Sequence, residues 1–162
     1  MNKTYEILII AKNTNGIVAR IMSMFNRRGY FVEKMTAGIT NIPGHARLTL
    51  TVRGDEETLD QIQKQVYKII DVVKVKVFPQ DRTIRRELML IKVKSNHDNR
   101  AQIVQIAEIY RGKVLDVGPN SLVVELTGEV GKLRGFVEAM EAYGILEMAK
   151  TGVLAMSRGE KM

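Results

Sequence analysis

The fold is decided by residues 5–30, which read YEILIIAKNTNGIVARIMSMFNRRGY. The apolar run Tyr5–Ala11 predicts a buried strand, and the polar cluster Lys12–Gly16 that follows it predicts a turn. Residues 17–28 place apolar side chains at helical spacing and end in two arginines before Gly29, which is typical of an amphipathic helix and its C-terminal stop. The stretch therefore predicts a strand, a tight turn and a helix in immediate succession.

The chain up to residue 80 completes a β-α-β-β-α-β order. Alternating apolar and polar side chains indicate half-buried strands, and a 3-4-3 spacing of apolar residues indicates a second helix. Turn-forming residues at 41–44 separate two of the strands. The predicted elements are strands over 31–39, 47–52 and 73–77, and a helix that opens at Gly54-Asp55 and carries Leu59, Ile62, Val66 and Ile69 on one face.

The second half repeats this order of elements without repeating the residues. We predict strands over 88–93, 113–117, 121–126 and 145–150, with helices over 101–110 and 129–143. The stretch from Gln80 to Arg86 is the expected boundary, so that residues 1–80 and 81–162 form two domains. Residues 151–162 carry no clear pattern and are assigned to the second domain.

The repeated order predicts an α+β protein of two ferredoxin-like βαββαβ domains, each a four-stranded antiparallel sheet with both helices on one face. Strands such as 7–10 and 88–91 are apolar on both faces, which indicates that the face without helices is also covered. A second domain or a second chain is the expected cover. Because domains of about 80 residues bury too little surface to be very stable alone, we expect at least a dimer.

The composition narrows the class of protein. There is no cysteine, which excludes disulfides, thiol nucleophiles and Cys-ligated zinc. The N-terminal apolar run is too short for a membrane span, so we expect a soluble cytoplasmic protein. Lys and Arg number 25 against 18 Asp and Glu, but the surplus is spread over both halves and no recognition motif accompanies it. A nucleic-acid-binding protein is therefore a minor alternative.

Catalytic residues are not indicated by the sequence. The two histidines, His45 and His97, fall in predicted loops and have no cysteine or carboxylate cluster with which to bind a metal. The acidic residues lie mainly on exposed helix faces, and no Gly-rich phosphate loop is present. We expect no catalytic residue, no metal site and no cofactor in this chain.

The turn between the first strand and the first helix is the one candidate binding site. Free N–H groups at a helix N-terminus suit a carboxylate, and Gly16 lets the backbone approach a ligand closely. Asn13 offers a donor and an acceptor, and Ile17 and Val18 are expected to supply an apolar wall. Together these residues would suit a small apolar amino acid, although an ordinary capped strand-to-helix turn is the commoner explanation of these residues alone.

Six stretches in order along the chain resemble the acetolactate synthase (acetohydroxyacid synthase) small regulatory subunits. They cover nearly the whole sequence, which makes the resemblance specific. The stretches are residues 10–30 (IAKNTNGIVARIMSMFNRRGY), 54–56 (GDE), 61–66 (QIQKQV), 86–93 (RELMLIKV), 109–117 (IYRGKVLDV) and 150–159 (KTGVLAMSRG).

The resemblance implies an N-terminal ACT domain, which is an amino-acid-binding regulatory module, and a C-terminal domain that contributes to activation. It implies a homodimer through the ACT domains and a large catalytic subunit as partner, which the small subunit activates and makes sensitive to feedback by valine. The complex condenses two pyruvates to acetolactate and CO₂ in branched-chain amino acid biosynthesis. Thiamine diphosphate, Mg²⁺ and FAD would then belong to the large subunit.

The resemblance also implies a valine site at the ACT dimer interface. One chain would contribute Asn13, Gly16, Ile17 and Val18, and the other would contribute Phe31 and Val32. The family commonly has asparagine where this chain has Phe31, so we expect altered effector binding there. The alternatives are a stand-alone amino-acid-sensing ACT protein and a basic nucleic-acid-binding protein.

Overall fold

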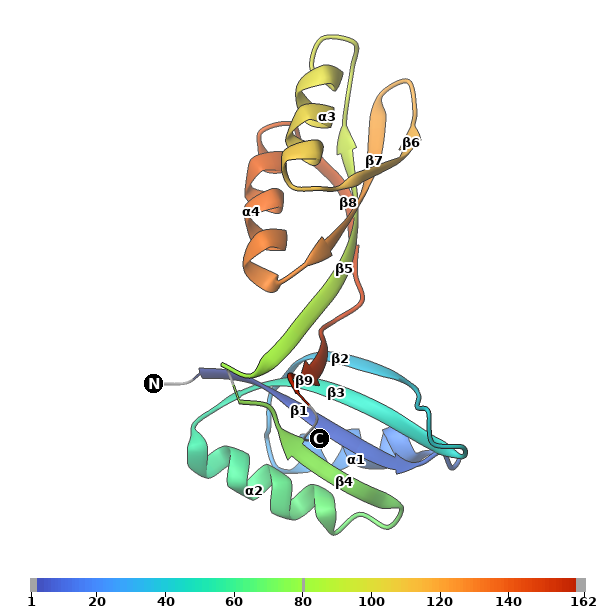
Figure 1. Ribbon diagram of the computed structural model, residues 1–162, viewed down its shortest axis with the longest axis vertical. Helices are drawn as coiled ribbons and strands as arrows, with labels where there is room; N and C mark the ends of the chain where they lie inside the picture. The colour runs from blue at the N-terminus through green and yellow to red at the C-terminus, as the bar shows by residue number, and fades with distance from the viewer. Residues whose placement is uncertain (1–2, 80, 160–162) are drawn as a thin grey trace. The chain divides into compact units, whose positions relative to one another are not determined.

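The computed structural model of the chain describes residues 3–79 and 81–159, which form two compact units (Figure 1). The first unit runs through Ile84 and also includes the segment from Gly152 onward, and the second runs from Arg85 to Thr151. The change of unit between Ile84 and Arg85 falls within the expected boundary stretch from Gln80 to Arg86, four residues after the predicted limit at residue 80, which itself lies outside the described residues. The assignment of the C-terminal segment to the second domain is wrong, for a reason given below.

The first unit has the predicted β-α-β-β-α-β order. Its sheet is antiparallel, with strands in the order β2-β3-β1-β4, so that β2 and β4 are the edges. The elements are β1 (Lys3–Lys12), α1 (Ile17–Arg27), β2 (Val32–Ile39), β3 (His45–Gly54), α2 (Glu56–Tyr67) and β4 (Val72–Val77).

Both helices of this unit pack on one face of its sheet (Figure 1). Alternate residues of β1 point to that face, and the helices contribute apolar residues three or four positions apart, as the predicted periodicities require. The fully buried members of this core include Ile7, Ile9, Ile21, Phe25 and Ile62.

The second unit repeats the arrangement with the strand order β6-β7-β5-β8, and the predicted fold class is confirmed. Its elements are β5 (Thr83–Lys94), α3 (Arg100–Ile109), β6 (Lys113–Val117), β7 (Ser121–Gly128), α4 (Val130–Glu141) and β8 (Ile145–Lys150). β5 begins five residues before the predicted start at Leu88. The core lies between the sheet and the two helices and contains an edge-to-face contact of Tyr110 with Phe136, with ring centroids 5.3 Å apart.

A ninth strand, β9 (Leu154–Ser157), was not predicted. Val153 and Ala155 are 2% and 3% exposed and form a small cluster with Leu8, Ile10 and Phe78 on the face of the first sheet that carries no helix. A stretch of four residues is too short to show the alternation of apolar and polar side chains that separates a strand from a loop, so β9 could not be predicted from the sequence. The chain's own C-terminal segment therefore covers this face over β1, where the sequence predicted a second domain or a second chain.

Polar contacts within the first unit hold this segment. The guanidinium of Arg47 donates to the carbonyl of Ala155, and Lys76 Nζ donates to Ser157 Oγ at 2.8 Å. The chain enters the segment through Gly152 at φ 84°, where a Cβ atom would lie 2.7 Å from Thr36 Oγ1. A glycine is required because this backbone region and this close approach both exclude a side chain.

Among residues 3–79 and 81–159, no helix is long and apolar enough to cross a membrane.

Candidate functional site

The candidate site is the loop between β1 and α1. Gly16 occupies the N-cap position of α1 with φ 79° and ψ 4°, a left-handed conformation that glycine adopts without strain. No side chain caps the helix, and in the described part of the chain the N–H groups of Val18 and Ala19 have no hydrogen-bond partner. A Cβ on Gly16 would meet no atom within 4 Å. The loop thus presents two unpaired donors at the positive end of a helix dipole, beside open space.

An ion pair outside the predicted site residues holds this loop in place. The carboxylate Oδ2 of Asp71, in the turn between α2 and β4, accepts from Arg20 Nη2 at 2.9 Å and from Thr14 Oγ1 at 3.2 Å. The backbone carbonyl of Asp71 accepts from the N–H of Lys12 at 2.8 Å. The Arg20 guanidinium is the main reason that the pKa of Asp71 lies below its ordinary value. Asp71 therefore fastens the loop at both Lys12 and Thr14.

The structure gives different surroundings to the predicted residues of this loop. Asn13 is exposed, and its N–H donates to the carbonyl of Gly44 at 2.8 Å, which joins the loop to the turn between β2 and β3. Val18 is half-buried at the surface. Ile17 is only 2% exposed and belongs to the core, so its side chain anchors the helix and is not the ligand-facing wall that the sequence predicted.

Phe31 and Val32 lie far from the loop within one chain. Lys12 pairs with His45 on β3, whereas Val32 pairs with Val52, seven residues further along the same strand. At about 3.3 Å per residue the two places are about 23 Å apart. Phe31 is 63% exposed, and its carbonyl accepts from the N–H of Arg53 at 3.4 Å. A single chain therefore does not bring the two groups of predicted site residues together.

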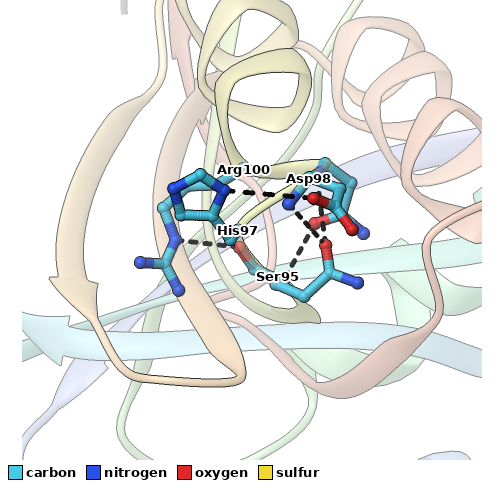
Figure 2. Close-up of polar contacts among 6 residues, drawn as sticks. Ser95, His97, Asp98 and Arg100 are labelled. Atoms are coloured by element: carbon cyan, nitrogen blue, oxygen red, sulfur yellow. Dashed lines mark hydrogen bonds and ion pairs between the residues drawn. The ribbon is translucent and has the colours of Figure 1, made fainter.

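The corresponding loop of the second unit, between β5 and α3, is held by hydrogen bonds from its own side chains (Figure 2). Asn96 Oδ1 accepts from the N–H groups of Asp98 and Asn99 at 3.0 Å, and Asn99 Oδ1 accepts from the N–H of Asn96 at 2.8 Å. Here the N-cap residue is Asn99, whose side chain is engaged in the loop, whereas Gly16 has none.

A second arginine fixes this loop. Figure 2 shows the Arg100 side chain reaching Ser95, where Nε donates to Oγ at 3.2 Å. Its Nη2 donates to the carbonyl of Gly118 at 2.7 Å in the turn between β6 and β7. The Arg100 guanidinium therefore stabilises this loop, and Ser95, Asn96 and Asn99 line a cavity of about 450 Å³ beside it.

His97 lies in a loop, as predicted, whereas His45 is the first residue of β3, so its predicted placement in a loop is wrong. His45 Nδ1 is 2.9 Å from the carbonyl of Pro43, and His97 is fully exposed with Nδ1 3.9 Å from the carboxylate of Asp98 (Figure 2). Within the described residues, no group of three or more histidine, cysteine, aspartate or glutamate side chains could hold a metal ion.

Two family models match the chain, one in each part. Residues 13–75 match the ACT domain, and residues 86–159 match the small subunit of acetolactate synthase. The second match runs through the second unit and β9.

Known proteins resemble the chain along its whole length. A probable acetolactate synthase small subunit of Methanothermobacter thermautotrophicus is 40% identical, covering 98% of this chain and 95% of that one. The isozyme 3 small subunit of Escherichia coli is 36% identical over 95% of each. The crystal structure of the acetolactate synthase small subunit from Thermotoga maritima superposes with a TM-score of 0.90 at 34% identity, over 98% of this chain and 99% of that one. The chain therefore belongs to the family of acetolactate synthase small subunits.

Proposed function

We propose that the chain is the regulatory subunit of an acetolactate synthase, that it binds and activates the catalytic subunit, and that valine bound to its ACT domains inhibits the complex. The observation that carries this proposal is the match to small subunits over 98% of the chain, with both units and β9 included. Thiamine diphosphate, Mg²⁺ and FAD belong, in this proposal, to the catalytic subunit. The second unit contributes to activation.

The loop before α1 is the proposed place for the carboxylate of valine. The N–H groups of Val18 and Ala19 are free to donate to an anion, and Gly16 leaves the approach open. The exposed Asn13 side chain has both a donor and an acceptor for the ammonium and carboxylate groups. The half-buried Val18 supports apolar contact with the isopropyl group of the ligand.

The exposed strand β2 supports a valine site that is shared by two chains, because two copies could pair through it. β2 is an edge strand of eight residues, and its apolar Met35 and Ile39 are 40% and 84% exposed. An exposed apolar edge strand is a template for pairing with another strand. If two copies pair antiparallel over the full length of β2, Val32 lies opposite the other copy's Ile39, which is the end of β2 next to the turn that receives the N–H of Asn13. Phe31 and Val32 of one chain would then lie beside the loop before α1 of the other.

The proposed assembly is tested by light scattering on the purified chain. The expected mass is twice the 18.3 kDa of one chain, and Ile39→Lys on the edge strand should reduce it toward 18.3 kDa. A wild-type mass of 18.3 kDa at micromolar concentration contradicts the two-chain site.

The proposed function is tested by measuring acetolactate formation by the cognate catalytic subunit, with and without this chain, across a valine titration. We expect higher activity with the chain, and inhibition by valine only when the chain is present. Valine binding without any association with the catalytic subunit would indicate a stand-alone amino-acid sensor. Salt-sensitive binding to DNA or RNA with no effect on acetolactate formation would indicate a nucleic-acid-binding protein.

A further inference from the structure

A groove between α1 and α2 carries positive charge that the fold does not neutralise. The groove has a volume of about 840 Å³, and its charged side chains are Arg20, Arg27, Arg28 and Lys68, which we call the basic groove. Arg20 is paired with Asp71. In the described part of the chain the other three are exposed and have no acidic partner.

The sequence around the groove explains the unbalanced charge. α1 has no acidic residue, and the acidic residues of α2 lie toward its N-terminal half, where Asp60 pairs with Lys64 at 2.6 Å. Arg20 and Arg27 are seven residues apart on α1, which places them about 10 Å apart along the helix axis. Cations at helix C-termini also interact favourably with the helix dipole, so stability must be measured separately from binding.

Apolar side chains distinguish this surface from a site for nucleic acid. Met24 and Ile69 line the groove, and exposed apolar residues lie on both sides of Ile69 along the chain, at the end of α2 and at the start of β4. Tyr67, Ile70 and Val73 are 52%, 78% and 53% exposed. Arginine, methionine and aromatic side chains with a charged rim are typical of protein–protein interfaces.

We infer that the basic groove and the adjoining Tyr67, Ile70 and Val73 are a docking surface for an acidic, partly apolar patch of the catalytic subunit. The positive charge of the groove would complement the negative charge of that patch, because Arg27 and Arg28 would form charge-assisted hydrogen bonds with carboxylates of the catalytic subunit. This inference rests on the proposed function, because it names the surface by which the two subunits meet.

The test measures the affinity of the full chain for the cognate catalytic subunit at low and at high salt. The variant Arg27→Glu/Arg28→Glu reverses two groove charges, and Arg27→Gln/Arg28→Gln removes them without placing acids at the end of α1. The charge-matched control Arg82→Glu/Arg158→Glu changes two exposed residues of the first unit outside the groove. Melting temperatures establish that each variant is folded.

We expect the reversed variant to bind roughly tenfold more weakly or worse, with a smaller salt dependence, while the control binds as wild type does. The neutral variant should fall between them. Equal affinity and salt dependence of all variants would overturn the inference while leaving the proposed function intact. Failure of the wild-type chain to bind the catalytic subunit would refute the proposed function and the inference with it. Binding to RNA is measured for the same variants. If the reversed variant loses binding to RNA while its affinity for the catalytic subunit stays that of wild type, the inference is also overturned.

Discussion

Replacing Gly16 by aspartate should weaken the binding of valine without unfolding the protein. The loop offers its free N–H groups on Val18 and Ala19, and a carboxylate at residue 16 would lie next to them. The new side chain meets no atom within 4 Å at its Cβ, so no clash is introduced. The aspartate would accept those hydrogen bonds itself and would repel the carboxylate of the ligand.

The magnitude follows from the separation of the two charges. With the ligand carboxylate bound to the same first turn, the two carboxylates would lie about 4 Å apart. Like charges at that distance repel by roughly 1 kcal/mol in bulk water and roughly 4 kcal/mol at an effective dielectric constant of 20. The valine affinity should therefore fall roughly fivefold to several hundredfold.

Calorimetric titration of the full chain with valine measures this effect, and Gly16→Asn is the matched control. Asparagine has the same shape, the same left-handed backbone at φ 79° and the same capping capacity, but no charge. Melting temperatures of the two variants should agree. Equal valine affinities for the aspartate and asparagine variants would refute the placement of the ligand carboxylate at this loop.

Three further predictions test the other parts of the first unit. Phe31→Asn restores a polar partner for the ligand and should tighten valine binding by about 1–3 kcal/mol, roughly five- to 150-fold by calorimetry, so an unchanged or weaker affinity would contradict this role. Val153→Ala removes a side chain that is 2% exposed and should lower the free energy of unfolding by about 1.5–3 kcal/mol, measured by hydrogen exchange in β1. Leu154→Ala, at a residue 56% exposed, should change it by less than about 0.5 kcal/mol, and equal losses would mean that the C-terminal segment does not dock through Val153. Asp71→Asn should increase hydrogen exchange in the loop before α1 and weaken valine binding. Because Arg20 lowers the pKa of Asp71 from 3.8, the stabilisation is present above pH 3.8 and is lost as the pH falls below it; acid sensitivity of the loop that is identical in the variant would argue against this role.

Patterns within short windows were enough to predict the order of the elements from β1 to β8. The helical spacing in residues 17–28 depends only on which neighbouring side chains face the core, and it reappears in α1. The alternation in residues 47–52 predicted the strand β3 but not its burial, because Thr49 and Thr51 are only 2% and 4% exposed. Gly16 before α1 also indicated a candidate binding site, because an N-cap residue without a side chain leaves the first backbone N–H groups of the helix without a capping acceptor.

Such patterns could not predict contacts between residues that are far apart in the sequence. Asp71 and Arg20 are 51 positions apart, and the residues around each of them do not indicate the other. Their ion pair forms because β4 pairs with β1 and so brings Asp71 beside the loop. Likewise, the sequence could not separate Ile17 as a core residue from Ile17 as a ligand contact, since the direction of a side chain at a helix start depends on how that helix packs.

The sequence by itself determined the element order from β1 to β8, the two ferredoxin-like units and the loop before α1 as the candidate site, because the periods of strands and helices and the chemistry of turns are local properties. Only the tertiary structure decided that the last residues belong to the first unit. Val153 and Ala155 are small residues in a short stretch, and their burial on Leu8 and Ile10 depends on the chain returning more than a hundred residues later to a particular face of a sheet. Such a return is set by the summed packing of the whole unit, and no window of neighbouring residues contains it.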